Sequence, residues 1–424
     1  IIVTAHGNIP LVKQAIHEYD AYDFVEKGQF NAQQFVEVAR AAIRDARLKK
    51  AEAKAKVRLR LIVTFNQDYL VGSELIGPNR HAVYRTTNHR RFKSAELIRR
   101  ADNLNILVLS GNANLWRPEI RSLGKAIHNV LFKEQSFQTG LITGQALAKH
   151  PSDLWLQFSG TAKDLGIPFE LLYSGDEYLG RTHVLTRQLI PSGNTLLQKT
   201  ELFHTFLTGL MKRKEALHIL IVGSNVDKTI PSAETEAMLL KKTIESDLHQ
   251  LGVACEVNTL LGIEASYDSV SKALRNGRYH IFHYAGHGLY DETLPEISGL
   301  VLHKNNDLSI LTAANLNALT SNTELRLVFL SCCLGARNAS HVGRGDFYGM
   351  LEAVASAGVP MALGYRWTVL DGAAMRFAEA FYETLWRTFS PEEALLEARI
   401  RATLGPKGLD DETWASPVLI MQNG

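Results

Sequence analysis

Three runs rich in apolar residues constrain the fold of this chain more than any other feature. They are LHILIVGS at residues 217–224, YHIFHYAG at 279–286 and LRLVFLSCC at 325–333, and helix-like segments lie between them. A strand that is apolar on both faces belongs inside a sheet that helices cover on both sides. Strands that alternate with helices are typical of a mostly parallel sheet. We therefore expect an α/β fold for the carboxyl-terminal half, closed by the strand SPVLIMQ at an edge.

The amino-terminal half repeats this rhythm less clearly. Short strands are predicted at RLRLIVTF (58–65), LNILVLS (104–110) and DLWLQFS (153–159), and helices at 11–56 and 117–133. At 424 residues the chain is too long for one ordinary core. We expect an N-terminal helical segment (1–57), a smaller α/β domain (58–200) and a second α/β domain (201–424).

Composition excludes several classes of protein. An apolar fraction of 46% with 21% charged residues is typical of a globular protein, and no run of about 18 apolar residues predicts a membrane span. The chain starts at Ile1 without a signal-like segment, so we expect a partial chain that can lack a preceding domain. Cys255, Cys332 and Cys333 fit neither a disulfide framework nor a zinc site. We expect no metal, no cofactor and a reducing, cytoplasmic setting.

Charge is distributed unevenly between the halves. Up to Glu215 the balance of Lys and Arg over Asp and Glu is +10, and beyond it −8, which gives the formal net charge of +2. The halves can attract each other or different partners. A basic run from Arg40 to Lys56 predicts a solvated helix face first, and a contact with nucleic acid or an acidic partner second.

A histidine between two glycines is the strongest sign of chemistry. In HYAGHGLY, Gly286 and Gly288 flank His287 and leave its ring and backbone open to a ligand. Both this segment and LSCC lie at carboxyl ends of predicted parallel strands, where ligands bind in such sheets. If the two strands are neighbours, His287 and a cysteine can face each other. Taken alone, a GHG turn or a cysteine pair is more often structural.

A cysteine and a histidine together suffice for acyl transfer. The imidazole accepts the thiol proton and later returns it to the leaving amine. Side chains alternate along a strand, so Cys332 is expected in the core and Cys333, at the turn into LGARN, as the nucleophile. The backbone N–H groups of Gly288 and Cys333 are the candidates for the oxyanion hole.

These motifs resemble those of the CHAT proteases, caspase-like cysteine peptidases related to separase, gingipains and metacaspases. HIFHYAGHG is similar to the histidine motif of that family, and LVFLSCC to its cysteine motif, usually written LSAC, which aligns Cys333 with the nucleophile. GMLEAVASAGVPMALGYRWTVLDGAAMRFAEAFYETL, PEEALLEAR and WASPVLI follow the family's order. The resemblance covers about 200–424, and LGA after Cys333 departs from it. It implies a caspase-like three-layer sandwich.

The resemblance also extends to the preceding half and to the substrate. IPFELLYSGDEYL is similar to a segment that precedes the protease domain, and residues 58–200 look like a pseudoprotease. Caspase-like enzymes bind an extended peptide beside a strand, here GYRWTVLD at 364–371. Candidate substrate-binding residues are Trp367, Arg366, Asp371 and Asp346. Asp371 is equally a candidate N-cap for the helix that follows it.

The resulting hypothesis is a cysteine endopeptidase that cleaves a specific protein and is activated by a signal, for example in bacterial antiviral defence or cell death. Loops 289–297 and 335–346 are expected to order on activation, under the control of a regulatory or sensor partner. The alternatives are a catalytically silent caspase-like scaffold, and a module that responds to nucleic acid through the basic amino-terminal half.

Overall fold

The architecture is seen in a computed structural model of the chain. It describes residues 2–4, 24–26, 32–66, 69–92, 94–190, 202–276, 278–289, 299–304, 307–334, 348–367, 369–405 and 407–422.

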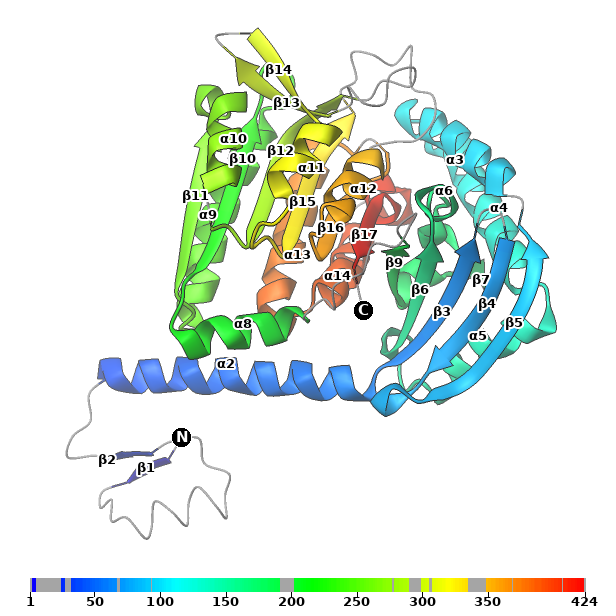
Figure 1. The fold of residues 1–424 in the computed structure, drawn as a ribbon, viewed down its shortest axis with the longest axis horizontal. Coiled ribbons are helices and arrows are strands. Elements are labelled where there is room, and N and C mark those ends of the chain that lie inside the picture. Colours follow the sequence, from blue (N-terminus) through cyan, green and yellow to red (C-terminus); the bar gives the residue numbers. More distant parts are fainter. Residues whose placement is uncertain are drawn as a thin grey trace.

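One sheet of 13 strands runs through both halves of the chain (Figure 1). Its path is β11 (Cys255–Leu261), β10 (Leu217–Ser224), β12 (Ile281–Leu289), β15 (Leu327–Leu334), β16 (Met361–Tyr365), β17 (Pro417–Met421), β9 (Val184–Leu189), β6 (Leu154–Gly160), β3 (Leu59–Asn66), β4 (Tyr69–Ile76) and β5 (Ala82–Arg91). All neighbours are parallel except at β16–β17, β3–β4 and β4–β5. The hairpin β13 (Gly299–Lys304) and β14 (Asp307–Thr312) extends from β12.

Helices cover both faces of the carboxyl-terminal half of the sheet. Ile219 and Ile221 of β10 pack in one apolar cluster, and Leu220 and Val222, which alternate with them, pack in another. The first cluster includes α8, α9 and α13, and the second includes α10, α11 and α12 (Figure 1). The described helices of eight residues or more are α2 (Ala32–Val57), α3 (Ser94–Leu109), α4 (Ala113–Phe132), α5 (Gln135–Leu147), α8 (Phe203–Arg213), α9 (Ser232–Gln250), α10 (Tyr267–Asn276), α11 (Ala313–Thr320), α12 (Tyr348–Ser356), α13 (Asp371–Thr388) and α14 (Pro391–Thr403).

The predicted fold class is confirmed: a mostly parallel sheet lies between two helical layers. The runs 217–224, 279–286 and 325–333 and the segment SPVLIMQ correspond to β10, β12, β15 and β17. The strands at 58–65 and 153–159 and the helix at 117–133 also correspond to β3, β6 and α4. Within the described part of the chain, no helix is both long and apolar enough to cross a membrane.

Three expectations about individual elements are wrong. LNILVLS lies in α3, where Leu104 and Val108 are buried one helical turn apart, so a short apolar run did not distinguish helix from strand. Within the predicted helix 11–56, α2 covers residues from Ala32 onward, but Phe24–Glu26 is a strand, β2, paired with β1 (Ile2–Thr4); the rest of 11–31 lies outside the described residues. SPVLIMQ is not at an edge, because β17 lies between β16 and β9.

Buried charges join the two halves where β17 meets β9. Glu170, from the amino-terminal half, accepts hydrogen bonds from Arg187 and lies 3.3 Å from the guanidinium of Arg399 on α14. All three side chains are fully buried. Arg399 also donates to the carbonyl oxygen of Pro417, at the start of β17. The division at 57 and 200 stays a prediction, although one sheet spans the second of these boundaries.

The basic helix α2 contacts the carboxyl-terminal half directly. Arg44 donates to the carbonyl oxygen of Gly252, and Lys54 forms an ion pair of 2.9 Å with Glu393. These cations therefore face protein groups rather than solvent alone. Glu393 lies in the first turn of α14, where its backbone N–H donates to the hydroxyl of the N-cap residue Ser390.

Candidate active site

The two central strands, β12 and β15, bring the candidate histidine and cysteine side by side. They are parallel neighbours, and His287 pairs in register with Cys333, as Gly286 does with Cys332. Residues in register on adjacent strands occupy the same face of a sheet. The expectation that these strands are neighbours is therefore confirmed, and positions 287 and 333 share one face at the carboxyl ends of the strands.

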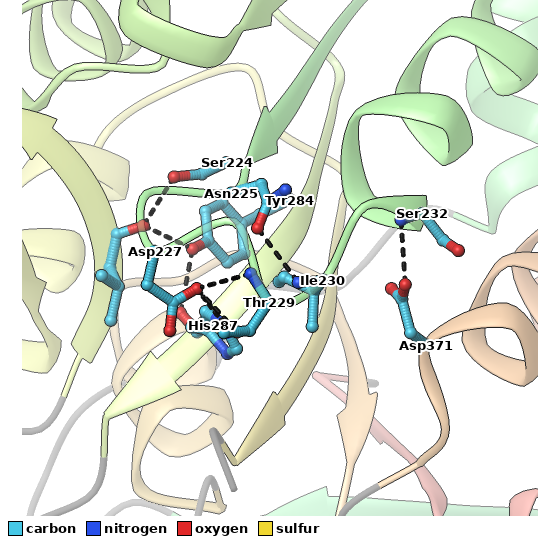
Figure 2. A network of polar contacts seen from close by, with 10 residues as sticks. Ser224, Asn225, Asp227, Thr229, Ile230, Ser232, Tyr284, His287 and Asp371 are labelled. Carbon is cyan, nitrogen blue, oxygen red and sulfur yellow. Dashed lines mark hydrogen bonds and ion pairs between the residues drawn. The ribbon is translucent and has the colours of Figure 1, made fainter. Parts of the chain in front are cut away.

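The imidazole of His287 is held through one of its nitrogens. Nε2 lies 3.0 Å from Oδ1 of Asp227 and 2.8 Å from Oγ1 of Thr229, and the Thr229 hydroxyl donates to the same Asp227 oxygen at 2.7 Å (Figure 2). An ionised carboxylate only accepts hydrogen bonds, so Nε2 carries the proton. In the neutral ring Nδ1 is then the basic nitrogen. This atom is buried and has no hydrogen-bond partner among the described residues.

Asp227 is ionised in this arrangement. Partial burial alone raises the pKa of its carboxyl, but two hydrogen bonds from Thr229 and the charge and hydrogen bond of His287 outweigh burial, so the pKa is lowered. A carboxylate at Nε2 stabilises the positive charge that the ring gains when Nδ1 takes a proton. His287 itself is 9% exposed, whereas the side chain of Asp227 is 32% exposed, so water reaches the carboxylate more readily than the ring.

A short loop between β10 and α9 carries Asp227 and Thr229. Asn225, one residue beyond β10, accepts the N–H of Ile230 on its side-chain oxygen at 3.0 Å. Lys228 adopts a left-handed conformation with φ of 60°, which turns the chain so that its neighbours on both sides point to His287 (Figure 2). At the other end, the Ser232 N–H donates to Oδ2 of Asp371 at 2.9 Å.

The glycines beside His287 serve packing as well as access. Gly286 is buried, and a Cβ there would overlap the hydroxyl of Tyr284. That hydroxyl lies 2.9 Å from the carbonyl oxygen of His287, so it holds the histidine backbone in place. The space at Gly286 is therefore filled, contrary to the expectation that it is open to a ligand. Gly288 is also buried and pairs with Leu300 of β13, and its role in an oxyanion hole stays a prediction.

Cys332 lies in the core, as expected from the alternation along β15. It is 2% exposed and packs in the same apolar cluster as Leu330. This leaves position 333 as the candidate for chemistry on the face shared with His287.

The candidate substrate-binding residues lie apart from one another. β16 ends at Tyr365, so most of GYRWTVLD is not strand. Trp367 is 1% exposed and donates its indole N–H to the carbonyl oxygen of Glu412, so a place in a subsite stays a prediction that requires this side chain to leave the core. Arg366 is half-buried, and its charge helps to lower the pKa of Glu170. Asp346 lies outside the described residues.

Asp371 does not cap its own helix, contrary to one of its two predicted roles. It is the first residue of α13, the N-cap position is Leu370, and the carboxylate caps α9 at Ser232 instead. Its other predicted role, in a substrate pocket, stays a prediction. Of the two candidate activation loops, 289–297 and 335–346, all residues except Leu289 lie outside the described residues.

The profile of the CHAT domain matches residues 121–422. The chain belongs to the CHAT domain family. This match includes β12, β15 and the loop that carries Asp227, and it begins within α4 of the amino-terminal half, well before residue 200. Membership supports a protease-type function. No curated protein sequence matches the chain.

Solved structures that align with this chain include separase in its complex with securin from Saccharomyces cerevisiae. It is 14% identical with a TM-score of 0.35, and the alignment covers 92% of this chain and 24% of separase. RgpB of Porphyromonas gingivalis, with its pro- and mature domains, is 15% identical with a TM-score of 0.41, over 66% of this chain and 67% of that one. The CHAT-domain chain thus spans about a quarter of the separase chain.

Sequence reasoning missed Asp227 and Thr229. The apolar run 217–224 and the signals for the helix after it predict the elements on either side of the loop, and neither pattern points to a residue within it. The available signal was a carboxylate just beyond the carboxyl end of the strand next to β12. Among the residues that the structure describes, no three His, Cys, Asp or Glu side chains gather as metal ligands would.

Proposed function

We propose that this CHAT-domain protein is a cysteine endopeptidase with Cys333 as nucleophile and His287 as general base. One observation carries the proposal: His287 stands in register with Cys333, while Asp227 and Thr229 occupy its Nε2 and Nδ1 has no described partner. Membership in the CHAT domain family supports the same class of reaction.

In the proposed reaction, Nδ1 of His287 takes the proton of the Cys333 thiol as the sulfur attacks the peptide carbonyl carbon. The imidazolium that forms is stabilised by Asp227 at Nε2. The carbonyl oxygen becomes an oxyanion, for which the N–H groups of Gly288 and Cys333 are the proposed donors. Collapse of this intermediate breaks the C–N bond, and the ring returns its proton to the leaving amine. Water then hydrolyses the thioester with the same base.

The proposed substrate is a specific protein that presents an extended segment to the carboxyl edge of β12 and β15. Asp371, Arg366, Trp367 and Asp346 remain the candidates for contacts with it. We further propose that a signal or a regulatory partner activates the enzyme, as in a defence or cell-death pathway of the cytoplasm. Three cysteines without a disulfide framework support a reducing compartment.

The test is incubation of the purified protein with the proteins encoded beside its gene, each with and without Cys333→Ala. We expect new fragments only from the protein that retains Cys333. His287→Gln is a second inactive control, and Cys332→Ser a matched control for loss of a neighbouring thiol. Fragments that persist with Cys333→Ala would overturn the cysteine mechanism.

The two alternatives make different predictions. A silent scaffold would bind a partner but leave it intact under every condition that orders the site. A nucleic-acid module would be retained on RNA or DNA and released by salt. Contacts of Arg44 and Lys54 with the carboxyl-terminal half reduce the number of cations that α2 offers to such a ligand.

A further inference from the structure

The start of α9 is held by a residue from another helix. Pro231, at its N-cap position, has no side-chain acceptor for the backbone N–H groups of the first turn, so this turn lacks its own cap. The carboxylate of Asp371 supplies the missing acceptor to the Ser232 N–H at 2.9 Å (Figure 2). A carboxylate at a helix N-terminus is also favoured by the helix dipole.

The position of this helix start fixes the loop before it. Only four residues separate Asp227 from Ser232, and the Ala233 N–H closes a turn onto the carbonyl oxygen of Ile230 at 3.1 Å. The first turn of α9 also packs closely on β10, since a Cβ on Gly223 would lie 2.9 Å from the carbonyl oxygen of Ala233. The loop therefore has little freedom while both ends stay in place.

We propose that Asp371 is a positioning residue: by capping α9 it holds the loop that keeps Asp227 at Nε2 of His287. The inference rests on the proposed function, and it gives Asp371 a role in orienting the base rather than only in choosing the substrate. Asp371 follows the segment after β16, which is anchored because Trp367 N–H donates to Oγ of Ser416 at 3.1 Å. The position of the segment between β16 and α13 therefore influences the tautomer of His287 through Asp371, the start of α9 and Asp227.

The first test needs no catalysis. Protein carrying Cys333→Ala and 15N-labelled histidine reports the tautomer of His287 through its ring nitrogen shifts, assigned by comparison with His287→Gln. We expect Asp371→Ala to move the ring from the Nε2–H tautomer toward a mixture. Asp371→Asn keeps an oxygen that accepts the Ser232 N–H and should restore the Nε2–H signal. Glu234→Gln, which removes a charge from the same turn of α9, is the matched control and should change nothing.

The second test uses a double-mutant cycle on kcat. Asp371→Ala should lower kcat about tenfold with KM nearly unchanged, for substrates with Arg or Leu before the scissile bond alike. In the Asp227→Ala background, Asp371→Ala should have almost no further effect, because its influence passes through Asp227.

Three results would overturn the proposal. An unchanged His287 tautomer in Asp371→Ala would show that the cap does not orient the ring. A loss limited to Arg substrates, equal for Asp371→Asn and Asp371→Ala, would assign Asp371 to the substrate pocket alone. An equal loss in the Asp227→Ala background would show a merely structural role. If the unaltered protein cleaves no substrate while the tautomer shifts as expected, the proposed function fails and the positioning role stands.

Discussion

Both halves of the sheet place two polar residues in register near the carboxyl ends of adjacent parallel strands, but the two pairs differ in their hydrogen bonds. In the amino-terminal half, Ser159 of β6 pairs in register with Gln188 of β9, as His287 does with Cys333. There the polar side chains satisfy one another: Gln188 Oε1 accepts from Gln157 at 2.6 Å and from Ser159 at 3.0 Å. In the carboxyl-terminal half, His287 keeps a buried ring nitrogen without a described partner.

A parallel sheet brings two side chains together, but general-base catalysis also needs a basic atom that no other group in the fold uses. Both halves place two residues in register near the carboxyl ends of adjacent parallel strands. A network whose donors and acceptors are all paired can stabilise the fold but offers no free base. The idea that residues 58–200 are a pseudoprotease stays a prediction, and the closed network at Gln188 is consistent with it.

The largest effect is expected from substitution of the proposed nucleophile or base in the carboxyl-terminal half. Cys333→Ala or His287→Ala should lower kcat by about 10⁴-fold or more, because nucleophile and base act as one unit. The corresponding substitutions in the other half, Ser159→Ala and Gln188→Ala, should leave kcat unchanged. Steady-state cleavage of an identified substrate measures both. Activity that depends on Gln188 as strongly as on His287 would mean that the halves share the chemistry.

The next effect concerns the contact between the halves. Glu170→Gln should cost about 3–5 kcal/mol of unfolding free energy, since it leaves Arg187 and Arg399 buried without their counter-charge. Burial alone raises the pKa of Glu170, but the charges of Arg187 and Arg399 and a hydrogen bond from Arg187 outweigh it, so the pKa is lowered. The stabilisation is therefore complete above the ordinary pKa of 4.5 and is lost as the pH falls through the lower, folded-state value.

Urea unfolding as a function of pH measures this contribution. The Glu170→Gln protein should lose less stability on acidification than the unaltered protein. Glu177→Gln, which removes an exposed carboxylate nearby, is the control and should change stability by less than about 0.5 kcal/mol. A stability loss no larger than that of this control would remove Glu170 as a link between the halves.

A smaller effect is expected where the base is oriented. Asp227→Asn should lower kcat by about 10²- to 10³-fold, because an amide can present the wrong hydrogen-bonding group to Nε2 and provides no charge for the imidazolium. Thr229→Val should cost about three- to tenfold, the equivalent of one hydrogen bond. Both should leave KM nearly unchanged. If kcat for Asp227→Asn were within twofold of the unaltered enzyme, Asp227 would have no part in catalysis, and Cys333 and His287 would act as a dyad.

The smallest effect concerns buried histidines that we do not place in the active site, and it is expected in the pH dependence of stability. Each half has one that is structural: burial lowers the pKa of His183 and of His280 to about 4. Nδ1 of His280 accepts the His218 N–H at 3.0 Å, so this ring is neutral. Because the folded pKa lies below the ordinary 6.5, stability is complete above pH 6.5 and declines as the pH falls toward 4.

His280→Gln should therefore flatten the dependence of stability on pH between 6.5 and 4, by about 1–2 kcal/mol at pH 5. Thermal unfolding across that range is the measurement. An acid slope equal to that of the unaltered protein would show that the folded-state pKa of His280 is close to its ordinary value. His287, near the carboxyl end of the strand that begins just after His280, should instead affect kcat.

Local patterns were enough to find His287 and Cys333. Apolar runs identified β10, β12 and β15, and the rule that ligands bind at carboxyl ends of parallel strands led to both residues. The same patterns failed at LNILVLS, whose seven residues fit a buried helix face as well as a strand. They also failed at SPVLIMQ, because β9, its second neighbour, comes from the other half of the chain.

By itself, the sequence determined the α/β class and the positions of the main strands in the carboxyl-terminal half, and it predicted the two residues that we propose for acyl transfer, since periodicity and strand ends are local properties. Tertiary structure alone decided that Asp227 and Thr229 occupy Nε2 of His287, that Asp371 caps α9 rather than α13, and that Trp367 is buried. These contacts join residues 58, 60, 139 and 45 positions apart. No periodicity encodes them, because they depend on where packing places helix starts and loops around the sheet.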